Sequence, residues 1–157
     1  MKPPPGILPV VTRTRPTIVF LCVHNAGRSQ MAAAWARHLG GEAVEVLSGG
    51  SDPAAAINPS AVAVMAEAGI DLTGQVPRRW TEDEIRAARA VITMGCGDTC
   101  PFFPGVRYED WEIADPAGLD PDAVRPIRDD LRRRVADLLQ RLGVEPGRAY
   151  PSGGASG

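Results

Sequence analysis

Residues 17–29 read TIVFLCVHNAGRS, an apolar run followed by a short polar loop. The segment 17–21 is rich in β-branched side chains and has no polar interruption after Thr17, which is typical of a parallel strand buried on both faces. A helix is expected almost at once, because residues 29–39 are rich in Ala, Gln and Met and stop at Gly40-Gly41. A buried strand that enters a helix through a tight loop favours an α/β fold.

The rest of the chain continues the alternation of strands and helices. Further strands are expected at 43–47 and 90–94, and further helices at 59–68, from Thr81 through a capping box with Glu84, and at 122–142. Pro126 should either kink the last helix or mark its true start. This order predicts a parallel sheet between layers of helices, with right-handed crossovers.

Length and composition indicate one globular domain. The chain has 157 residues, of which 44% are hydrophobic and 23% charged. We expect residues 1–16, which contain five prolines, to be a flexible leader, residues 17–143 to form the domain, and residues 144–157 to be a flexible tail.

Charge and hydropathy exclude several classes of partner. The net charge of -2 gives no electrostatic reason to expect nucleic acid or an anionic membrane surface. No apolar run approaches the roughly 18 to 20 residues that span a bilayer, and none resembles a signal peptide. We therefore expect a cytoplasmic protein, in which three cysteines are more plausibly catalytic, redox-active or metal-binding than a disulfide framework.

The loop between the first strand and its helix has the pattern Cys-x5-Arg-Ser, from Cys22 to Arg28 and Ser29. Successive N–H groups in such a loop form a nest for an oxyanion, and the positive end of the following helix adds to it. Gly27 permits the tight path, and Asn25 tolerates a left-handed conformation. The candidate substrate-binding residues are Cys22, Val23, His24, Asn25, Ala26, Gly27 and Arg28.

The side chains of this loop suggest nucleophilic chemistry. The guanidinium of Arg28 can hold two oxygens of an oxyanion at once. The positive surroundings favour the thiolate of Cys22, and Ser29 could donate a hydrogen bond to it. The alternative is that Cys22 is an inert buried cysteine at a strand end and that Arg28 is a surface residue.

The other two cysteines, Cys96 and Cys100, follow the strand that ends at Met94. The carboxyl ends of parallel strands meet at one edge of a sheet, so all three cysteines could be neighbours in space. A spacing of four places two Cα atoms about 6 Å apart within a helical turn, which is inside disulfide range. A zinc site is a weaker alternative, because the chain has only three Cys and two His and the Cys-x3-Cys pattern is not a complete ligand set.

The motif Cys-x-x-Asn-x-x-Arg-Ser resembles the phosphate loop of low-molecular-weight tyrosine phosphatases and of the arsenate reductases that share their fold. The resemblance covers about residues 17–143 and implies a three-layer α/β sandwich with a central parallel four-stranded sheet flanked by helices. Gln30 stands where the phosphatases usually have Pro, which favours the reductases.

The resemblance also implies an activity, namely reduction of arsenate to arsenite. Cys22 would attack arsenate, Cys96 would attack the sulfur of the adduct, and Cys100 would attack the resulting disulfide, which thioredoxin would reduce. Without the resemblance, Asp115 before Pro116 would indicate only a turn. The resemblance implies that Asp115 acts as general acid. Phosphate and sulfate would compete with arsenate for the loop.

Two other functions stay open at this point. One is a tyrosine phosphatase, which would share every step up to the covalent adduct. The other is a non-catalytic module that binds an oxyanion or senses redox state. The presence of two further cysteines favours thioredoxin as the reductant over a small thiol such as mycothiol or glutathione.

No cofactor or resident metal is expected. Relatives often hold a monovalent cation with residues equivalent to Asn25 and Ser48 and a Glu at position 33. In this chain Ala33 removes that carboxylate.

Overall fold

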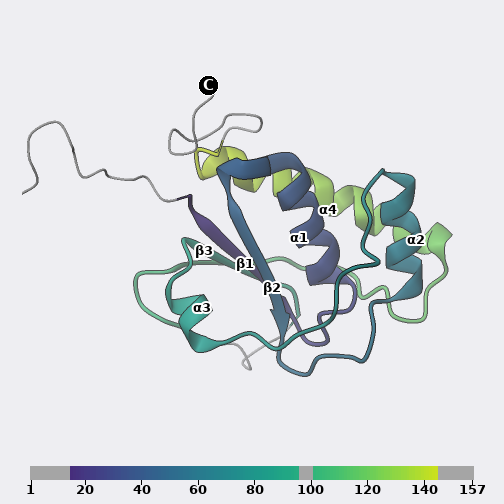
Figure 1. Ribbon diagram of the computed structural model, residues 1–157, viewed down its shortest axis with the longest axis horizontal. Helices are drawn as coiled ribbons and strands as arrows, with labels where there is room; N and C mark the ends of the chain where they lie inside the picture. Colours follow the sequence, from purple (N-terminus) through teal and green to yellow (C-terminus); the bar gives the residue numbers. More distant parts are fainter. Residues whose placement is uncertain (1–14, 96–100, 145–157) are drawn as a thin grey trace, which may run out of the picture.

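The computed structural model describes residues 15–95 and 101–144 (Figure 1). Four parallel strands form one sheet in the order β2-β1-β3-β4. The strands are β1 (Thr17–Cys22), β2 (Glu45–Gly50), β3 (Ala90–Thr93) and β4 (Arg107–Asp110). The helices are α1 (Arg28–Gly40), the 3-10 turn η1 (Gly41–Ala43), α2 (Pro59–Glu67), α3 (Glu82–Arg86) and α4 (Pro121–Arg141). The predicted α/β class with a parallel four-stranded sheet is confirmed.

Helices lie on both faces of the sheet. Figure 1 shows α1, α2 and α4 together on one side and the short α3 on the other. Alternate residues of β1 enter the two cores, because successive side chains of a strand point to opposite faces. Ile18 and Phe20 belong to the larger core with α1 and α4, whereas Val19 and Leu21 pack with the α3 residue Ile85. This explains why β1 is a continuous apolar run.

The second strand lies further along the chain than the sequence predicted. Residues 43–47 were expected to be extended, whereas β2 runs from Glu45 to Gly50 and residue 43 ends η1. The strand extends through its glycines because residues 48–50 pair with the last three residues of β1. Gly49 also lies against the backbone of Trp80, where an added Cβ would come within 2.9 Å of the Trp80 nitrogen.

The strand β4 was not located by the sequence pattern. Its residues, Arg-Tyr-Glu-Asp, are exposed or half-buried and contain no apolar run. Among the described residues it pairs with β3 alone and forms an edge of the sheet. Its side chains are exposed or half-buried, whereas those of β1 and β3 are buried on both faces.

The predicted helix starts are present. Asn58 caps α2 by accepting hydrogen bonds from two backbone N–H groups, and Thr81 and Glu84 form the capping box of α3. The last helix begins at Pro121 with Asp120 as its cap, so Pro126 lies inside the helix and does not mark its start.

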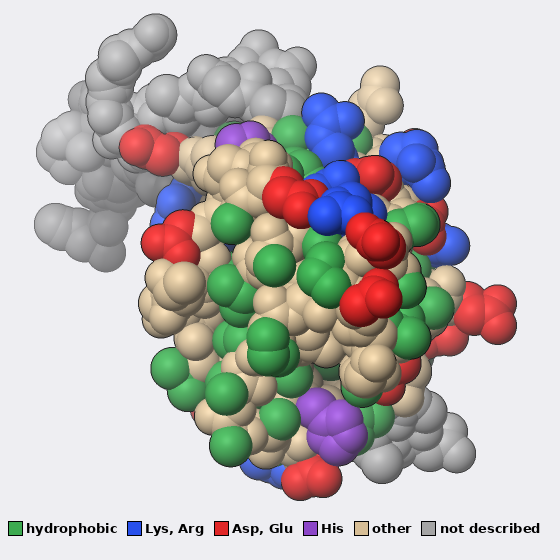
Figure 2. All heavy atoms as spheres, turned by 90° about the vertical axis from the view of Figure 1, so that its right-hand side faces the viewer, with side chains coloured by type: hydrophobic (Ala, Val, Ile, Leu, Met, Phe, Trp, Pro, Cys, Tyr) green, Lys and Arg blue, Asp and Glu red, His purple; other side chains and the backbone are tan. Residues whose placement is uncertain are grey.

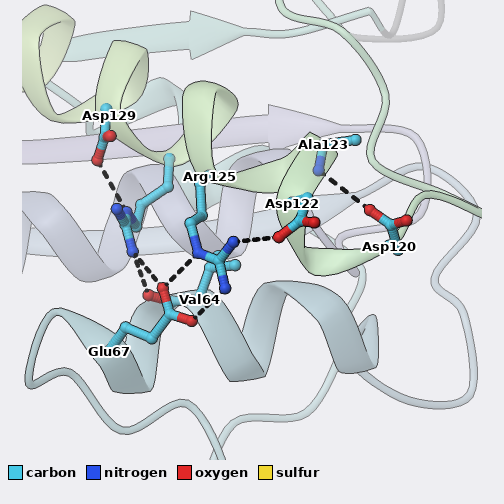
Figure 3. Close-up of polar contacts among 8 residues, drawn as sticks. Val64, Glu67, Asp120, Asp122, Ala123, Arg125 and Asp129 are labelled. Carbon is cyan, nitrogen blue, oxygen red and sulfur yellow. Dashed lines mark hydrogen bonds and ion pairs between the residues drawn. The ribbon is translucent and has the colours of Figure 1, made fainter.

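Ion pairs join α2 to α4. Figure 3 shows Glu67 of α2 accepting hydrogen bonds from Arg125, which also pairs with Asp122. Arg128 adds a hydrogen bond to Glu67 at 3.1 Å. The hydrogen bonds from Arg125, assisted by Arg128, lower the pKa of the Glu67 carboxyl to about 2. The pairing fixes α2, whose first residues lie beside the candidate site.

On the face shown in Figure 2, acidic and basic side chains lie next to one another. Within residues 15–95 and 101–144, no helix has the length and apolar character required to cross a membrane.

Candidate active site

The strand order places the candidate site at the end of β1. The chain passes from β1 to β2 on one side and then crosses to β3 on the other, so the carboxyl end of β1 is a topological switch point. Cys22 is the last residue of β1, and only 2% of its surface is exposed. The loop 23–27 joins it directly to α1.

Four carbonyl groups of this loop accept hydrogen bonds from the protein. Val23, His24 and Ala26 accept hydrogen bonds from the N–H groups of Asp52, Ala54 and Asn58. The Gly27 carbonyl accepts from Met31 inside the first turn of α1. The residues 52–58 that follow β2 therefore hold the loop from outside.

The N–H groups of the loop are left for a ligand. Within the described part of the chain, the N–H groups of residues 23–28 donate to no protein acceptor. Gly27 precedes α1 and has no side chain that could cap the helix. The first N–H groups of α1 therefore receive no hydrogen bond acceptor from a capping side chain. A loop whose carbonyls bond to the protein and whose N–H groups are free has the arrangement of an anion-binding nest.

Asn25 and Gly50 make the tight path of the loop possible. Asn25 has φ 51°, and it is the one non-glycine residue with positive φ among those the structure describes. Gly50 lies against the loop, where an added Cβ would come 2.5 Å from the Val23 carbonyl oxygen and 3.0 Å from the Asn25 nitrogen. Both neighbours are backbone atoms, so a larger residue at position 50 would displace the loop itself.

A buried chain of polar groups reaches the sulfur of Cys22. The Ser29 Oγ lies 2.9 Å from the Cys22 Sγ, which is the contact that the sequence predicted. The Asn25 Nδ2 donates to Ser29 Oγ at 2.7 Å. The Asn25 Oδ1 in turn accepts from Gln30 Nε2 and from the backbone N–H of Arg78, both at 3.0 Å.

Arg78 ties this network to the neighbouring elements. Its guanidinium donates to the Ser48 carbonyl in β2 at 2.7 Å and pairs with Glu84 of α3 at 2.5 Å. Burial would raise the pKa of the Glu84 carboxyl, but hydrogen bonds from Arg78 and Thr81 outweigh it and lower that pKa. The sequence analysis did not identify Arg78, because its role depends on contacts between residues that are far apart in the chain.

Arg28 and Asp115 come together on the rim of the loop. The Arg28 side chain is 13% exposed and donates to the Ile113 carbonyl at 3.4 Å. Its second terminal nitrogen lies 3.7 Å from the Asp115 carboxylate, which is 54% exposed. The predicted turn is also present, since Asp115 accepts a hydrogen bond from the N–H of Ala117. The carboxylate is thus held beside the guanidinium that would grip an oxyanion.

Pro116 packs directly on the oxyanion loop. A Cβ added to Gly27 would come 2.6 Å from the Pro116 Cγ. The Pro116 carbonyl accepts a hydrogen bond from Asn58 Nδ2 at 3.2 Å, so the cap of α2 also holds the segment that carries Asp115. The motif Asn58-Pro59 indicated only a helix start.

Cys96 and Cys100 lie outside the described residues, so the structure tests no contact of these two thiols. The residues that lead to them are described. Met94 is fully buried and its N–H donates to the Leu21 carbonyl at 2.8 Å. Gly95 has φ 89°, and its backbone lies against Arg28, whose Nη1 would be 2.6 Å from an added Cβ.

The remaining predicted residues have simple surroundings. His24 is about half exposed, and its Nδ1 lies 3.0 Å from the Asp52 carbonyl oxygen. Ala33 is fully buried in the larger core. No group of three or more metal-ligating side chains is found among residues 15–95 and 101–144.

Comparison with known proteins agrees with this geometry. Residues 17–147 match the family model described as low molecular weight phosphotyrosine protein phosphatase. Arsenate reductase 1 of Bacillus cereus is 38% identical over 123 residues, which cover 76% of this chain and 90% of that protein.

Two solved structures are similar to this chain. The thioredoxin-dependent arsenate reductase of Corynebacterium glutamicum has a TM-score of 0.71 and 40% identity, covering 82% of this chain and 62% of that one. A structure described as an arsenate reductase in the phosphate binding state has a TM-score of 0.69 and 31% identity, covering 80% of this chain and 98% of that one. The chain therefore belongs to the low molecular weight phosphotyrosine protein phosphatase family and is a homologue of arsenate reductases.

Proposed function

We propose that this protein is an arsenate reductase, in which Cys22 is the nucleophile and Cys96 and Cys100 carry the oxidation away from the site. Arsenate would bind in the nest 22–28 with two oxygens on the Arg28 guanidinium. The free N–H groups of the loop and the uncapped start of α1 support this step. Phosphate and sulfate are tetrahedral oxyanions like arsenate, and they would compete for the same loop.

The first covalent step forms a bond between the Cys22 sulfur and arsenic. The thiolate attacks As(V), and an oxygen leaves as water after Asp115 has supplied a proton. The position of the Asp115 carboxylate 3.7 Å from Arg28 supports this role, because Arg28 would hold the oxyanion from which the oxygen departs.

The second step is the redox step. The Cys96 thiolate attacks the Cys22 sulfur, so that a disulfide forms and the sulfur–arsenic bond breaks. The electron pair of the broken bond stays on arsenic, which leaves as arsenite, As(III). The Cys100 thiolate then attacks the Cys96 sulfur and releases Cys22 as a thiolate.

The observation that carries the assignment to arsenate is the contact between Gly95 and Arg28. Gly95 immediately precedes Cys96, so the chain enters the segment with the two additional cysteines from the oxyanion site itself. Thioredoxin is the proposed reductant of the final disulfide, in line with the thioredoxin-dependent relative. Such a cycle needs a reducing compartment, and we propose the cytoplasm.

The proposal is tested by arsenate-dependent NADPH consumption with thioredoxin and thioredoxin reductase. Wild type is expected to turn over, and Cys22→Ser, Cys96→Ser and Cys100→Ser are each expected to lose multiple turnover. Asp115→Asn should lower the rate. Asp71→Asn is the matched control, because Asp71 also accepts an N–H two residues on but lies outside the site.

A phosphatase is the competing function, and the family match favours it enough to require a test. If wild type does not reduce arsenate but hydrolyses an aryl phosphate, and Cys96→Ser leaves that hydrolysis intact, the protein is a phosphatase. Binding of arsenate with neither reaction would instead indicate an oxyanion-binding or redox-sensing module.

A further inference from the structure

One polar side chain beside the site is buried at a cost. Gln30 on α1 is 1% exposed, and no protein group among the described residues bonds its Oε1. A buried oxygen without a partner destabilises a fold, and an apolar side chain of the same size would avoid the loss. Packing alone therefore does not explain a glutamine at this position.

The orientation of the Gln30 amide follows from a neighbouring backbone group. The Arg78 N–H can only donate, so the Asn25 atom that faces it at 3.0 Å must be the oxygen. The Gln30 atom that faces the same oxygen at 3.0 Å must then be the Nε2 amine. Gln30 therefore donates a hydrogen bond to Asn25. The Gln30 Oε1 points away from Asn25 and has no partner among the described residues.

The same argument fixes the direction of the bonds up to the sulfur. With its oxygen engaged by two donors, Asn25 presents its Nδ2 to the Ser29 Oγ at 2.7 Å. Ser29 therefore accepts from Asn25, and its one hydroxyl proton is free to point to the Cys22 Sγ at 2.9 Å. A proton donated to sulfur stabilises the thiolate and not the thiol.

We propose that Gln30 is a positioning residue, which holds the Asn25 amide so that Ser29 donates its proton to the Cys22 sulfur. Gln30 acts through Asn25 and Ser29 and does not touch the nucleophile. The inference rests on the proposed nucleophilic role of Cys22, but it does not depend on the oxyanion being arsenate.

The test is the pH dependence of Cys22 alkylation by iodoacetamide in the full chain, quantified by mass spectrometry of the Cys22 peptide. Gln30→Met removes the donor at nearly constant volume. Its alkylation midpoint is expected about half a pH unit higher, or roughly threefold in thiolate equilibrium, as for the loss of one ordinary hydrogen bond. Its unfolding temperature is expected to be equal or higher, because the orphaned oxygen is gone.

Two controls separate positioning from packing. Met31→Leu changes a fully buried residue next to Gln30 on the same helix, and it should leave the alkylation midpoint unchanged. Asn25→Gly keeps the positive φ but removes the amide, so adding Gln30→Met to it should produce no further shift. Gln30→Leu, which also removes the donor and adds no charge, provides the same test if the Met variant does not fold.

An unchanged midpoint in Gln30→Met, or a shift that persists in the Asn25→Gly background, would overturn the proposal. Alkylation involves neither arsenate nor the other cysteines, so this result is independent of the turnover assay. If wild type does not reduce arsenate but Gln30→Met still shifts the alkylation midpoint, the proposed function is refuted and the role of Gln30 stands.

Discussion

Replacing Gly27 by Ala should slow the step that uses Asp115 while Cys22 stays reactive. The added Cβ would lie 2.6 Å from the Pro116 Cγ and 3.4 Å from its Cδ. Because carbon atoms in contact prefer about 3.5–4.0 Å, Pro116 has to retreat by about 1 Å. The proline ring cannot rotate away, and its carbonyl is held by Asn58. The displacement of Pro116 therefore also moves the backbone of the preceding residue, Asp115.

A displacement of this size at a catalytic group can reduce turnover by on the order of 100-fold. We expect this loss in the thioredoxin-coupled arsenate assay, with alkylation of Cys22 by iodoacetamide at close to the wild-type rate. Gly27 has φ -138°, so the substitution introduces no left-handed strain of its own. The loss would come from the contact with Pro116.

The matched control is Gly74→Ala, because a Cβ at that position meets no atom within 4 Å. This variant should keep full turnover. Full turnover in Gly27→Ala would refute the reasoning, since the position of Asp115 would then not limit the rate. An equal fall in alkylation and turnover would also refute it, because the loop around Cys22 and not Asp115 would have been damaged.

Three further predictions concern the nucleophile, the loop and the helix pairing. Ser29→Ala should slow Cys22 alkylation at neutral pH roughly tenfold, as expected for a hydrogen bond to a charged group. Gly50→Ala should abolish protection of Cys22 by phosphate, because the new Cβ overlaps the Val23 carbonyl. Glu67→Gln should lower the unfolding temperature at pH 6. The difference should shrink below about pH 4.5 and vanish below about pH 2, because a carboxyl whose pKa is lowered on folding stabilises only while ionised.

Much of the fold could be predicted from local patterns. The strands β1 and β3 are apolar runs because each is paired on two sides and buried on both faces, and Asn58 and Thr81 mark helix starts by their own chemistry. The strand β4 gave no such signal. It is an edge strand with polar side chains, and only its pairing with β3 makes it extended.

The candidate site divides in the same way. Sequence patterns were enough to predict the loop from Cys22 to Arg28 and the contact with Ser29, because a short loop between a strand and a helix is built from neighbours in the chain. Tertiary structure alone decided that Gln30 and Arg78 meet at Asn25, that Gly95 lies against Arg28, and that Pro116 rests on Gly27. All but the contact between Gln30 and Asn25 join residues far apart in sequence. They depend on the order in which parallel strands bring their carboxyl ends to one edge, which no local pattern specifies.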